Sequence, residues 1–504
     1  MRLPIRARKS RDGSGNNSRE QGAGNQAVRL VAVTYGTEGD TRPIAALCRA
    51  LLDAGHEARL FADRSALGSA HALGVPAQAL AGDIKGALHS TEGLSKLVRR
   101  GSRFTDTARA LAELANANTE AWMRDIAAAG KGCDAILLSG LAAFAGLSVA
   151  EYLGVTAIGA GLIPITPTRE FSSPFLRPGL VPRWLNYWSQ NFVNATLWRA
   201  FRSATNAARA RVCGLPPRKA LWTDHPILYG VSPELLPRPA DWPSHAHLCG
   251  QWLPPVGAWS PPPALESFLA EGEPPIYVGF GSMAGFDQQG LLAEVVTAVA
   301  GRRAVFYPGW SGVEASVLPP NFFVVGDTPH SWLFPRMSAV MHHGGSGTTH
   351  SAARAGVPSI VVPFAADQFF WADRLRRLGV ASEPVRAGRV HAAALARSIA
   401  FAESPGARSN AAALGARMAT DNGLEKARSI IEALTSKRSG SSDRSARVVE
   451  SAVDGAPFVS ELGQQFEGSE DRQDEAGTTR EVRTERGGWR AKPDYVKREP
   501  WASG

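Results

Sequence analysis

The feature that most restricts how this chain can fold is an apolar run that ends in a glycine-bearing turn and leads into a helix. Residues 28–33 form such a run. The turn is residues 35–40 (Tyr-Gly-Thr-Glu-Gly-Asp), and a helical pattern follows at residues 43–52 and ends before Gly55. A second strand-like run follows at residues 59–62. A strand, a turn, a helix and another strand make a βαβ unit, which predicts a doubly wound α/β sheet.

The same arrangement begins again in the second half of the chain. Residues 291–300 predict a helix, and strand-like runs lie at residues 275–280, 304–307, 322–325, 339–342 and 359–362. A proline-rich stretch separates the two series and is typical of an interdomain linker. We therefore predict two α/β domains that face each other across a cleft. The N-terminal domain spans residues 28–235, the linker residues 236–274 and the C-terminal domain residues 275–436.

The formal net charge of +9 is unevenly distributed along the chain. Residues 1–27 carry six Lys or Arg and two acids, and residues 437–504 carry twelve basic and thirteen acidic residues, so +6 remains for residues 28–436. A mildly basic domain pair suits an anionic small molecule and forms no stripe for nucleic acid. We expect both ends to be disordered, residues 1–27 as a basic arm and residues 437–504 as a tail. Weak attachment of the arm to anionic membranes is the alternative.

The four cysteines are far apart and form no CxxC pair, so we expect neither a disulfide framework nor a zinc ribbon. The first 27 residues lack an apolar segment of the kind that secretory signals contain. The most apolar stretch, residues 135–164, is interrupted by Glu151 and is too short to cross a bilayer. We therefore expect a soluble cytoplasmic protein, with peripheral membrane attachment as the alternative.

Residues 164–216 are rich in proline and aromatic residues. Trp184, Trp188, Phe192 and Ala195 repeat at the spacing of one helix face. One interpretation is that this face packs on the sheet. The other is that the segment forms the wall of an apolar acceptor pocket or a surface that meets a membrane. The acceptor-binding candidates are Phe171, Phe175, Trp184 and Trp188.

The strongest chemical motif is residues 341–350, Met-His-His-Gly-Gly-Ser-Gly-Thr-Thr-His. A strand ends here, three glycines fall within four residues, and hydroxyl side chains open a helix. Glycines let a diphosphate approach the backbone, and the N–H groups at the positive helix end then bind it. Ser346 and Thr348 can add hydroxyl donors, and His343 can add a ring N–H. An ordinary turn is the alternative, but the position at the carboxyl end of a strand favours anion binding.

Asp367 and Gln368 follow the next strand, at residues 359–362. An acid and an amide at this rim can accept hydrogen bonds from several sugar hydroxyls and donate to others. The alternative role for Asp367 is that of a helix N-cap. These two residues by themselves do not distinguish the two roles.

The order of these motifs resembles the signature of the family 1 nucleotide-sugar glycosyltransferases. The motifs are His-His-Gly-Gly-x-Gly-Thr-Thr, Ala-Gly-Val-Pro, Val-Pro-Phe and Asp-Gln, and they are most similar to the sterol 3β-glucosyltransferase subgroup. Residues 278–283, 329–335, 166–171 and 197–201 agree with that subgroup. The likeness extends over residues 28–435. It implies a GT-B fold of two Rossmann-like domains, whose last helices cross back onto the N-terminal domain.

The resemblance also implies a set of donor-binding residues. The turn after residue 342, together with Ser282, would hold the donor diphosphate. Thr328 and His330 would lie by the nucleotide base and ribose. Asp367 and Gln368 would bind the sugar. The complete set is Thr37, Ser282, Thr328, His330, His343, Gly345, Ser346, Gly347, Thr348, Asp367 and Gln368.

Asp40 is the candidate catalytic base, because it follows the first strand at the rim that faces the cleft. The subgroup has a Gly-Ser/Thr-Arg-Gly-Asp turn where this chain has Gly-Thr-Glu-Gly-Asp. A carboxylate with an ordinary pKa of about 3.9 is a weak base, so burial against the acceptor should raise its pKa. The alternative is that Asp40 only caps the helix beginning near Pro43. Glu38 replaces the usual Arg and would repel an anionic donor unless it points away or pairs with Arg42.

Together these features predict an inverting, metal-independent glycosyltransferase. It would move a hexose, glucose by resemblance, from a UDP-sugar to the hydroxyl of a lipophilic acceptor such as a sterol. No metal-ligand spacing is visible, and no cofactor is expected. The alternatives are a polyketide, macrolide or hydroxy-fatty-acid acceptor, or a catalytically silent protein that binds a nucleotide sugar or lipid. The partners are thus small molecules and not nucleic acid, and the sequence does not indicate an oligomeric state.

Overall fold

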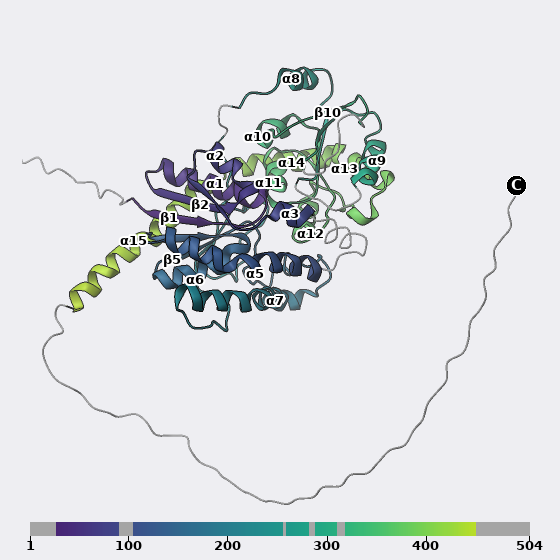
Figure 1. Cartoon of the computed structure of the whole chain (residues 1–504). Helices are drawn as coiled ribbons and strands as arrows, with labels where there is room; N and C mark the ends of the chain where they lie inside the picture. Colours follow the sequence, from purple (N-terminus) through teal and green to yellow (C-terminus); the bar gives the residue numbers. More distant parts are fainter. Residues whose placement is uncertain (1–26, 90–103, 256–258, 282–287, 310–317, 450–504) are drawn as a thin grey trace, which may run out of the picture. The chain divides into compact units, whose positions relative to one another are not determined.

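The computed structural model describes residues 27–89, 104–255, 259–281, 288–309 and 318–449 (Figure 1). The first of its two sheets has seven parallel strands in the order β3-β2-β1-β4-β5-β6-β7. Their bounds are β1 Arg29–Val33, β2 Glu57–Asp63, β3 Ala77–Leu80, β4 Ala135–Leu138, β5 Thr156–Gly161, β6 Ile227–Tyr229 and β7 Ala246–Leu248.

Helices cover both faces of this sheet. The helices are α1 Glu38–Asp53, α2 Gly68–Ala72, α3 Ile84–His89, α5 Phe104–Ala129, α6 Ala143–Leu153 and α7 Asn186–Ala208, with α15 Gly423–Val449 from the end of the chain. In β1, Leu30 and Ala32 share a core with α1, α2 and α15, whereas Val31 and Val33 share a core with α5, α6 and α7. β1 is apolar at successive positions because a parallel strand covered on both faces has no solvent side.

The second sheet has five parallel strands in the order β10-β9-β8-β11-β12. The strands are β8 Ile276–Gly279, β9 Ala304–Tyr307, β10 Phe322–Val324, β11 Ala339–His342 and β12 Ser359–Val361. One core lies under α9 (Gln288–Val299) and α13 (Ala392–Glu403), and the other under α8 (Pro263–Ala270), α10 (His330–Leu333) and α11 (Ser346–Arg354). α12 (Gln368–Arg377) and α14 (Pro405–Met418) pack beside α11. The predicted α/β fold with two parallel sheets is confirmed.

Each sheet reverses its strand order at one place, between β1 and β4 and between β8 and β11. At such a switch point the loops after the two central strands leave toward opposite faces, and a crevice opens between them. Asp40 follows β1, and the glycine-rich turn 343–348 follows β11. The topology therefore places both predicted motifs at the positions where open α/β sheets bind ligands.

Three boundaries differ from the sequence prediction. α1 begins at Glu38 and not near Pro43, because the Asp40 carboxylate accepts a hydrogen bond from the Thr37 backbone N–H (2.8 Å) and closes an earlier turn. β7 lies within the predicted linker and extends the first sheet, so the boundary at residue 236 is too early. α15 continues to Val449, past the predicted start of a disordered tail at residue 437.

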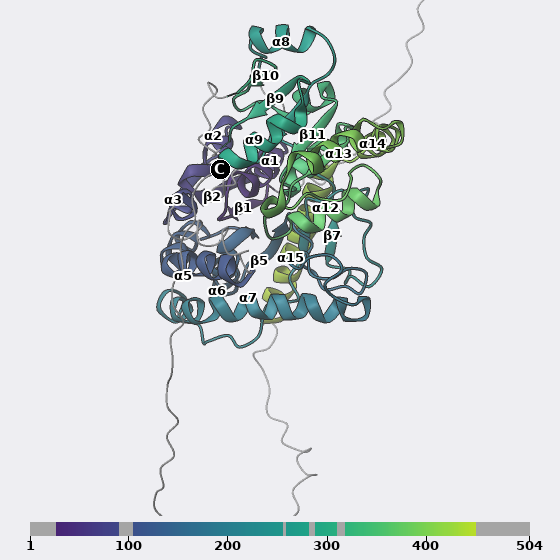
Figure 2. The ribbon, with the colours of Figure 1, turned by 90° about the vertical axis from the view of Figure 1, so that its right-hand side faces the viewer.

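The aromatic face predicted at residues 184–195 does not pack on the sheet. Trp184, Trp188 and Phe192 are 77%, 66% and 70% exposed. α7 buries its opposite side instead, where Trp198 and Phe201 are both 5% exposed. In Figures 1 and 2, α7 lies beside α5 and α6, on the side of them away from the first sheet. Among the described residues, no helix has the length and apolar character needed to span a membrane.

Candidate active site

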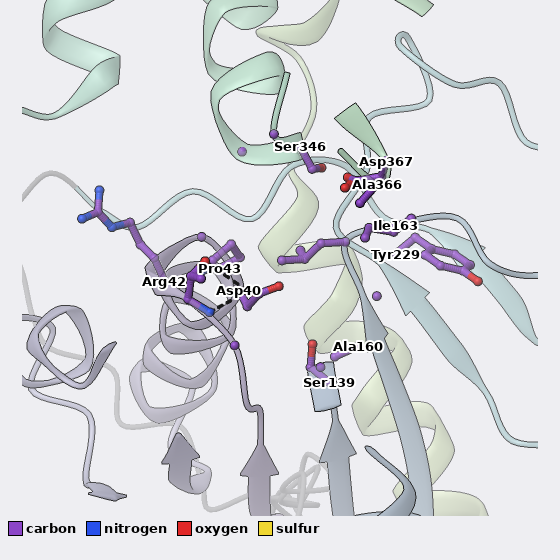
Figure 3. A pocket seen from close by; sticks show the side chains of 18 of the residues that line it. Asp40, Arg42, Pro43, Ser139, Ala160, Ile163, Tyr229, Ser346, Ala366 and Asp367 are labelled. Carbon is purple, nitrogen blue, oxygen red and sulfur yellow. Dashed lines mark hydrogen bonds between the residues drawn. The ribbon is translucent and has the colours of Figure 1, made fainter. Parts of the chain in front are cut away.

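A cavity of about 2490 Å³ lies at the carboxyl ends of both sheets, and both sheets contribute to its walls (Figure 3). It brings together Asp40 and every predicted donor-binding residue that the structure describes. The donor-binding residues at its wall are Thr37, Thr328, His330, His343, Gly345, Ser346, Gly347, Thr348, Asp367 and Gln368. Ser282 lies outside the described residues.

Asp40 lies in the first turn of α1. Its Oδ2 accepts hydrogen bonds from the backbone N–H (2.8 Å) and the hydroxyl (3.2 Å) of Thr37. Gly36 makes this geometry possible, since a Cβ there would lie 2.3 Å from Asp40 Oδ2. Burial raises the pKa of the Asp40 carboxyl, and the two hydrogen bonds from Thr37 offset part of the rise. The residue thus closes the helix end, as the capping interpretation expects, and also faces the cavity with a carboxylate that is more basic than usual.

The glycine-rich turn leads into α11 with its first N–H groups at the cavity. The Thr349 backbone N–H is the first to bond back along the helix, to Gly345 (2.9 Å). The N–H groups of residues 346–348 precede the first possible intrahelical bond, so they remain for an external acceptor. An added Cβ at Gly347 would meet nothing within 4 Å. The fold therefore does not require glycine at 347, whereas a ligand that approaches the backbone would.

Two histidines at this wall are held neutral. Burial lowers the pKa of His343 to about 4. Burial also lowers the pKa of His330 to about 4, and the Arg42 guanidinium acts in the same direction. Nδ1 of His343 is buried and has no hydrogen-bond partner among the described residues. A neutral His343 can offer one ring N–H to a phosphate oxygen, but it cannot offer a full positive charge.

Asp367 and Gln368 begin α12, beside the glycine-rich turn. Gly344 permits this proximity: its φ is +92°, and a Cβ would lie 2.9 Å from the Gln368 carbonyl. The Gln368 side-chain oxygen accepts hydrogen bonds from the backbone N–H groups of Phe364 (2.7 Å) and Ala365 (3.1 Å). The Trp371 indole N–H donates to Asp367 Oδ2 (2.9 Å). Both side chains are therefore oriented before a ligand arrives.

Asp367 also lies close enough to Asp40 to feel its charge. Burial raises the pKa of Asp367 to about 6, the Asp40 carboxylate adds to the rise, and the Trp371 hydrogen bond opposes it. Figure 3 shows the two carboxyl groups on separate elements around the same space. The Asp40 charge therefore disfavours ionisation of Asp367, which can donate a hydrogen bond to a ligand oxygen when protonated and accept from a hydroxyl when ionised.

We predict that Asp367→Asn stabilises the ligand-free protein. The folded state binds the Asp367 proton more tightly than the unfolded chain, whose Asp pKa is about 3.9. Stability from this group is therefore full below about pH 3.9 and is lost as the pH rises to about 6. Asn stays neutral and can still accept from Trp371, so the free energy of unfolding at pH 7 should rise by about 1–3 kcal/mol. Denaturant titrations from pH 4 to pH 7 test this: the gain should shrink toward pH 4, and a lower stability at pH 7 would contradict it.

Glu38 pairs with Arg42, which is one of the two arrangements expected for this unusual acid. Arg42 Nη2 lies 3.3 Å from Glu38 Oε1 and 3.2 Å from Asp327 Oδ2, in the loop before α10. Arg42 thus links α1 to the wall built by the second sheet. All three side chains are at least 28% exposed, so the contribution of these ion pairs to stability is small.

The acceptor-side wall differs from the prediction. Phe175 lines the cavity, but Phe171, Trp184 and Trp188 do not, and their assignment as acceptor-binding residues is corrected. Phe171 packs against Phe370 (ring centroids 5.2 Å apart). Beside Phe175, the aromatic lining on this side includes Phe144, Trp198, Phe201 and Trp222. The helical spacing in α7 was real, but the inner side of the helix supplies the wall.

Ser139 was missed by the sequence analysis, although it lies at the cavity. It follows β4 directly, and its backbone N–H donates to Val33 of β1 (2.8 Å). The signal that could have found it is the same strand-end rule that indicated Asp40, because β1 and β4 flank the switch point.

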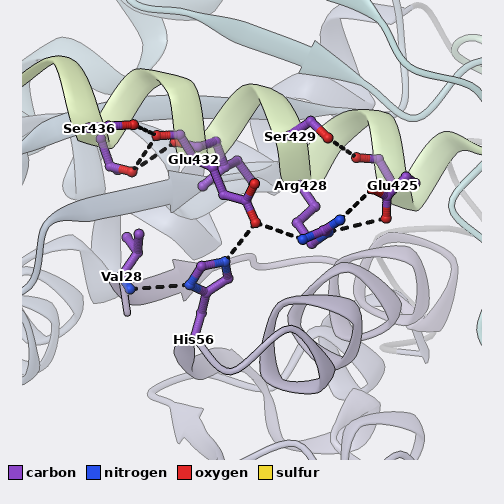
Figure 4. A network of polar contacts seen from close by, with 9 residues as sticks. Val28, His56, Glu425, Arg428, Ser429, Glu432 and Ser436 are labelled. Atoms are coloured by element: carbon purple, nitrogen blue, oxygen red, sulfur yellow. Dashed lines mark hydrogen bonds and ion pairs between the residues drawn. The ribbon is translucent and has the colours of Figure 1, made fainter. Parts of the chain in front are cut away.

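Two buried histidines connect elements that are far apart along the chain. His350 on α11 is 1% exposed; its Nδ1–H donates to the Ser346 carbonyl (2.7 Å), and its Nε2 accepts from the Ser232 backbone N–H (3.1 Å). This joins the first turn of α11 to the segment after β6. At the amino ends of β1 and β2, the Val28 backbone N–H donates to His56 Nδ1 (3.2 Å), and His56 Nε2–H donates to Glu432 of α15 (2.9 Å) (Figure 4).

We predict that His56→Ala lowers the unfolding temperature. The change leaves the Val28 N–H without its acceptor and removes one of the two partners of Glu432, which also accepts from Arg428 (2.8 Å). The expected loss of stability is about 1–3 kcal/mol. His71→Ala, at an exposed position on α2, is the matched control and should change stability by less than about 0.5 kcal/mol. Equal effects of the two changes in thermal unfolding would contradict the role of this network.

Two parallel α/β sheets with a shared cavity at their carboxyl ends are the architecture of the GT-B fold. The structure of the glycotransferase of kitacinnamycin shares this fold, with a TM-score of 0.58 at 18% identity over 81% of this chain and 99% of that one. Residues 291–434 match the family described as erythromycin biosynthesis protein CIII-like, C-terminal domain.

Two relatives identify the family. O-mycaminosyltylonolide 6-deoxyallosyltransferase of Streptomyces fradiae is 35% identical over 423 residues, which cover 80% of this chain and 97% of the relative. Sterol 3-beta-glucosyltransferase UGT80B1 of Arabidopsis thaliana is 30% identical over 414 residues, which cover 79% of this chain and 67% of the relative. The chain therefore belongs to the family 1 GT-B glycosyltransferases.

Proposed function

We propose that the protein transfers a hexose from a nucleoside diphosphate sugar, with UDP-glucose as the first donor to test, to the hydroxyl of a lipophilic acceptor such as a sterol. The observation that carries this proposal is the placement of Asp40 and the α11 N-terminus around one cavity. A base is needed where the acceptor loses its proton, and N–H donors are needed where the diphosphate leaves. The two requirements fall on opposite sheets.

In the proposed reaction the acceptor oxygen attacks the anomeric carbon of the sugar while the bond from that carbon to the diphosphate breaks. Attack from the side opposite the leaving group inverts the anomeric configuration. Asp40 takes the acceptor proton, and the N–H groups of residues 346–348 with neutral His343 receive the diphosphate charge. Preorganised N–H donors can stabilise this charge, which supports our proposal of a metal-independent reaction.

The walls also support a lipophilic acceptor. Phe144, Trp198 and Phe201 line the side built by the first sheet, and the ring centroid of Phe144 lies 5.1 Å from that of Trp198 and 5.3 Å from that of Phe201. Aromatic walls of this kind bury a flat apolar ligand better than a hydrophilic one. The sterol glucosyltransferase relative acts on acceptors of this character.

A macrolide acceptor is the second candidate. It is favoured by the relative from Streptomyces fradiae, named for 6-deoxyallosyl transfer to O-mycaminosyltylonolide, of which the alignment covers 97%. That name also makes a deoxyhexose donor an alternative to glucose.

A screen of donors against acceptors, read by mass spectrometry, tests both candidates. UDP-glucose and deoxythymidine diphosphate sugars would be combined with sterols, macrolides and hydroxy fatty acids. A glucosylated sterol is the expected product, and a product formed only from macrolides would favour the second candidate. Binding of nucleotide sugar without hydrolysis or transfer to any acceptor would instead support a catalytically silent binding protein.

A further inference from the structure

The outer face of α7 and the turn before it carry three large aromatic side chains followed by two arginines. We propose that this face docks on anionic lipid bilayers. We call it the aromatic–arginine face, and it consists of Trp184, Trp188, Phe192, Arg199 and Arg202.

The aromatic part is exposed to a degree that the fold does not explain. Trp188 and Phe192 are four residues apart, so they lie one turn apart on one side of α7, and Trp184 lies in the short 3-10 helix Arg183–Leu185 that leads into α7. They are the three most exposed aromatic side chains among the described residues, at 66–77%. Scattered apolar residues on a surface need no explanation, but a contiguous row of large ones marks an interaction site.

The basic part continues the same row. Arg199 lies seven residues after Phe192, and Arg202 lies ten residues after it. These spacings place both arginines on the same side of α7 as Phe192, and both are exposed. Residues 171–223 contain eight Lys or Arg and no Asp or Glu. Three of these arginines, at positions 209, 211 and 218, pair with Glu151 or Glu120. Within the described part of the chain, Arg183, Arg199 and Arg202 have no such carboxylate.

The combination of side chains favours a lipid surface over a second copy of this chain. In a two-fold dimer through this face, arginines would lie near arginines with no acid to separate them. In an anionic bilayer, tryptophans take their preferred place at the headgroup level, and arginines meet lipid phosphates. A helix that lies in the interface needs an apolar side next to basic residues, which is the pattern of α7.

The face also adjoins the cavity. Tyr187 contacts Trp188 edge to face, with ring centroids 6.2 Å apart, and Tyr187 lines the cavity together with Leu180 and Asn191. Docking would therefore place this wall of the cavity against the bilayer. If the proposed function holds, a lipophilic acceptor could enter without crossing water, but the docking itself does not depend on that function.

Vesicle co-sedimentation of the full chain tests the proposal. The probe is phosphatidylcholine vesicles with and without phosphatidylglycerol. We expect binding to the anionic vesicles, and we expect Trp184→Ser/Trp188→Ser/Phe192→Ser to weaken it by about tenfold or more. The matched control is Tyr152→Ser/Phe401→Ser, which removes exposed aromatic residues from α6 and α13 and should bind as the unchanged chain does.

Charge reversal provides the second arm. Arg199→Glu/Arg202→Glu should remove the preference for anionic vesicles, and its thermal unfolding should match that of the unchanged chain because both side chains are exposed. Replacing Arg6, Arg8, Lys9 and Arg11 by Gln measures the contribution of the basic arm in the same assay.

Three results would overturn the proposal: no binding of the unchanged chain to anionic vesicles, equal binding of the aromatic triple variant, or loss of all binding in the arm variant alone. A shift of the triple variant from dimer to monomer without a change in vesicle binding would show instead that the face joins two copies. The readout requires no turnover, so failure here would leave the proposed glycosyl transfer untouched.

Discussion

Replacing Asp40 by Asn is expected to lower the turnover number for glycosyl transfer by a factor of about 10²–10⁴. Asn can still accept the hydrogen bond from the Thr37 backbone N–H, so the first turn of α1 should remain intact. What it cannot do is take the acceptor proton. The change therefore separates the capping role of this carboxyl group, which the structure shows, from its proposed role as the base.

Three quantities are measured for the variant and the unchanged chain: turnover at saturating donor and acceptor, UDP affinity by calorimetry, and the temperature of thermal unfolding. UDP affinity should change by less than about threefold, which corresponds to about 0.6 kcal/mol. Asp83→Asn is the matched control, because Asp83 also accepts from a backbone N–H at a helix start (Gly86, 2.8 Å) but does not line the cavity. Near-normal turnover of Asp40→Asn would leave Asp40 only its capping role.

The pH profile of the unchanged enzyme should carry the same information. Because burial raises the Asp40 pKa, activity should fall on acidification at a higher pH than an ordinary Asp would cause. Burial raises the pKa of Asp367 in the same cavity to about 6. The fall in activity at acid pH therefore reflects protonation of Asp40 and Asp367 together.

Gly347→Val is expected to weaken UDP binding by about 100-fold or more, equivalent to about 2.7 kcal/mol, without destabilising the fold. A side chain at 347 would enter open space over the first N–H groups of α11, where we propose that the diphosphate lies. Glycine is a poor helix former, so a replacement that meets no neighbour should leave the free energy of unfolding equal or slightly higher.

The chain provides a closely matched control for this change. Gly406 occupies the second position of α14, as Gly347 does in α11, and an added Cβ there also meets nothing within 4 Å. Gly406 is exposed and does not line the cavity, so Gly406→Val should bind UDP normally. Equal UDP affinity of both variants would show that the first turn of α11 does not hold the diphosphate.

Local patterns predicted the strands well, because a strand covered on both faces must be apolar along its length. β9 and β11 lie where the apolar runs predicted them. The start of α1 was predicted too late, since a carboxylate that reaches back to Thr37 adds a turn before the apolar pattern begins. The linker was drawn too long because the three-residue strand β7 is too short to show a pattern of its own.

The site residues likewise include some that the sequence could identify and some that it could not. A local sequence signal, namely a strand end followed by polar or glycine residues, marks Asp40, the turn after β11 and Asp367. Ser139 had that signal as well, but without knowledge of the strand order nothing indicated that β4 lies next to β1. The aromatic wall was predicted on the wrong side of α7, because helical spacing identifies a face but does not say which neighbour it meets.

The sequence by itself determined the two strand–turn–helix series, the glycine-rich turn after β11 and the candidate base, since each depends on neighbours along the chain. Only the tertiary structure decided that these groups surround one cavity, that Glu38 pairs with Arg42 and Asp327, and that Trp184, Trp188 and Phe192 face outward. The physical reason is that proximity, burial and the resulting pKa shifts depend on strand order and helix packing, which join residues hundreds of positions apart.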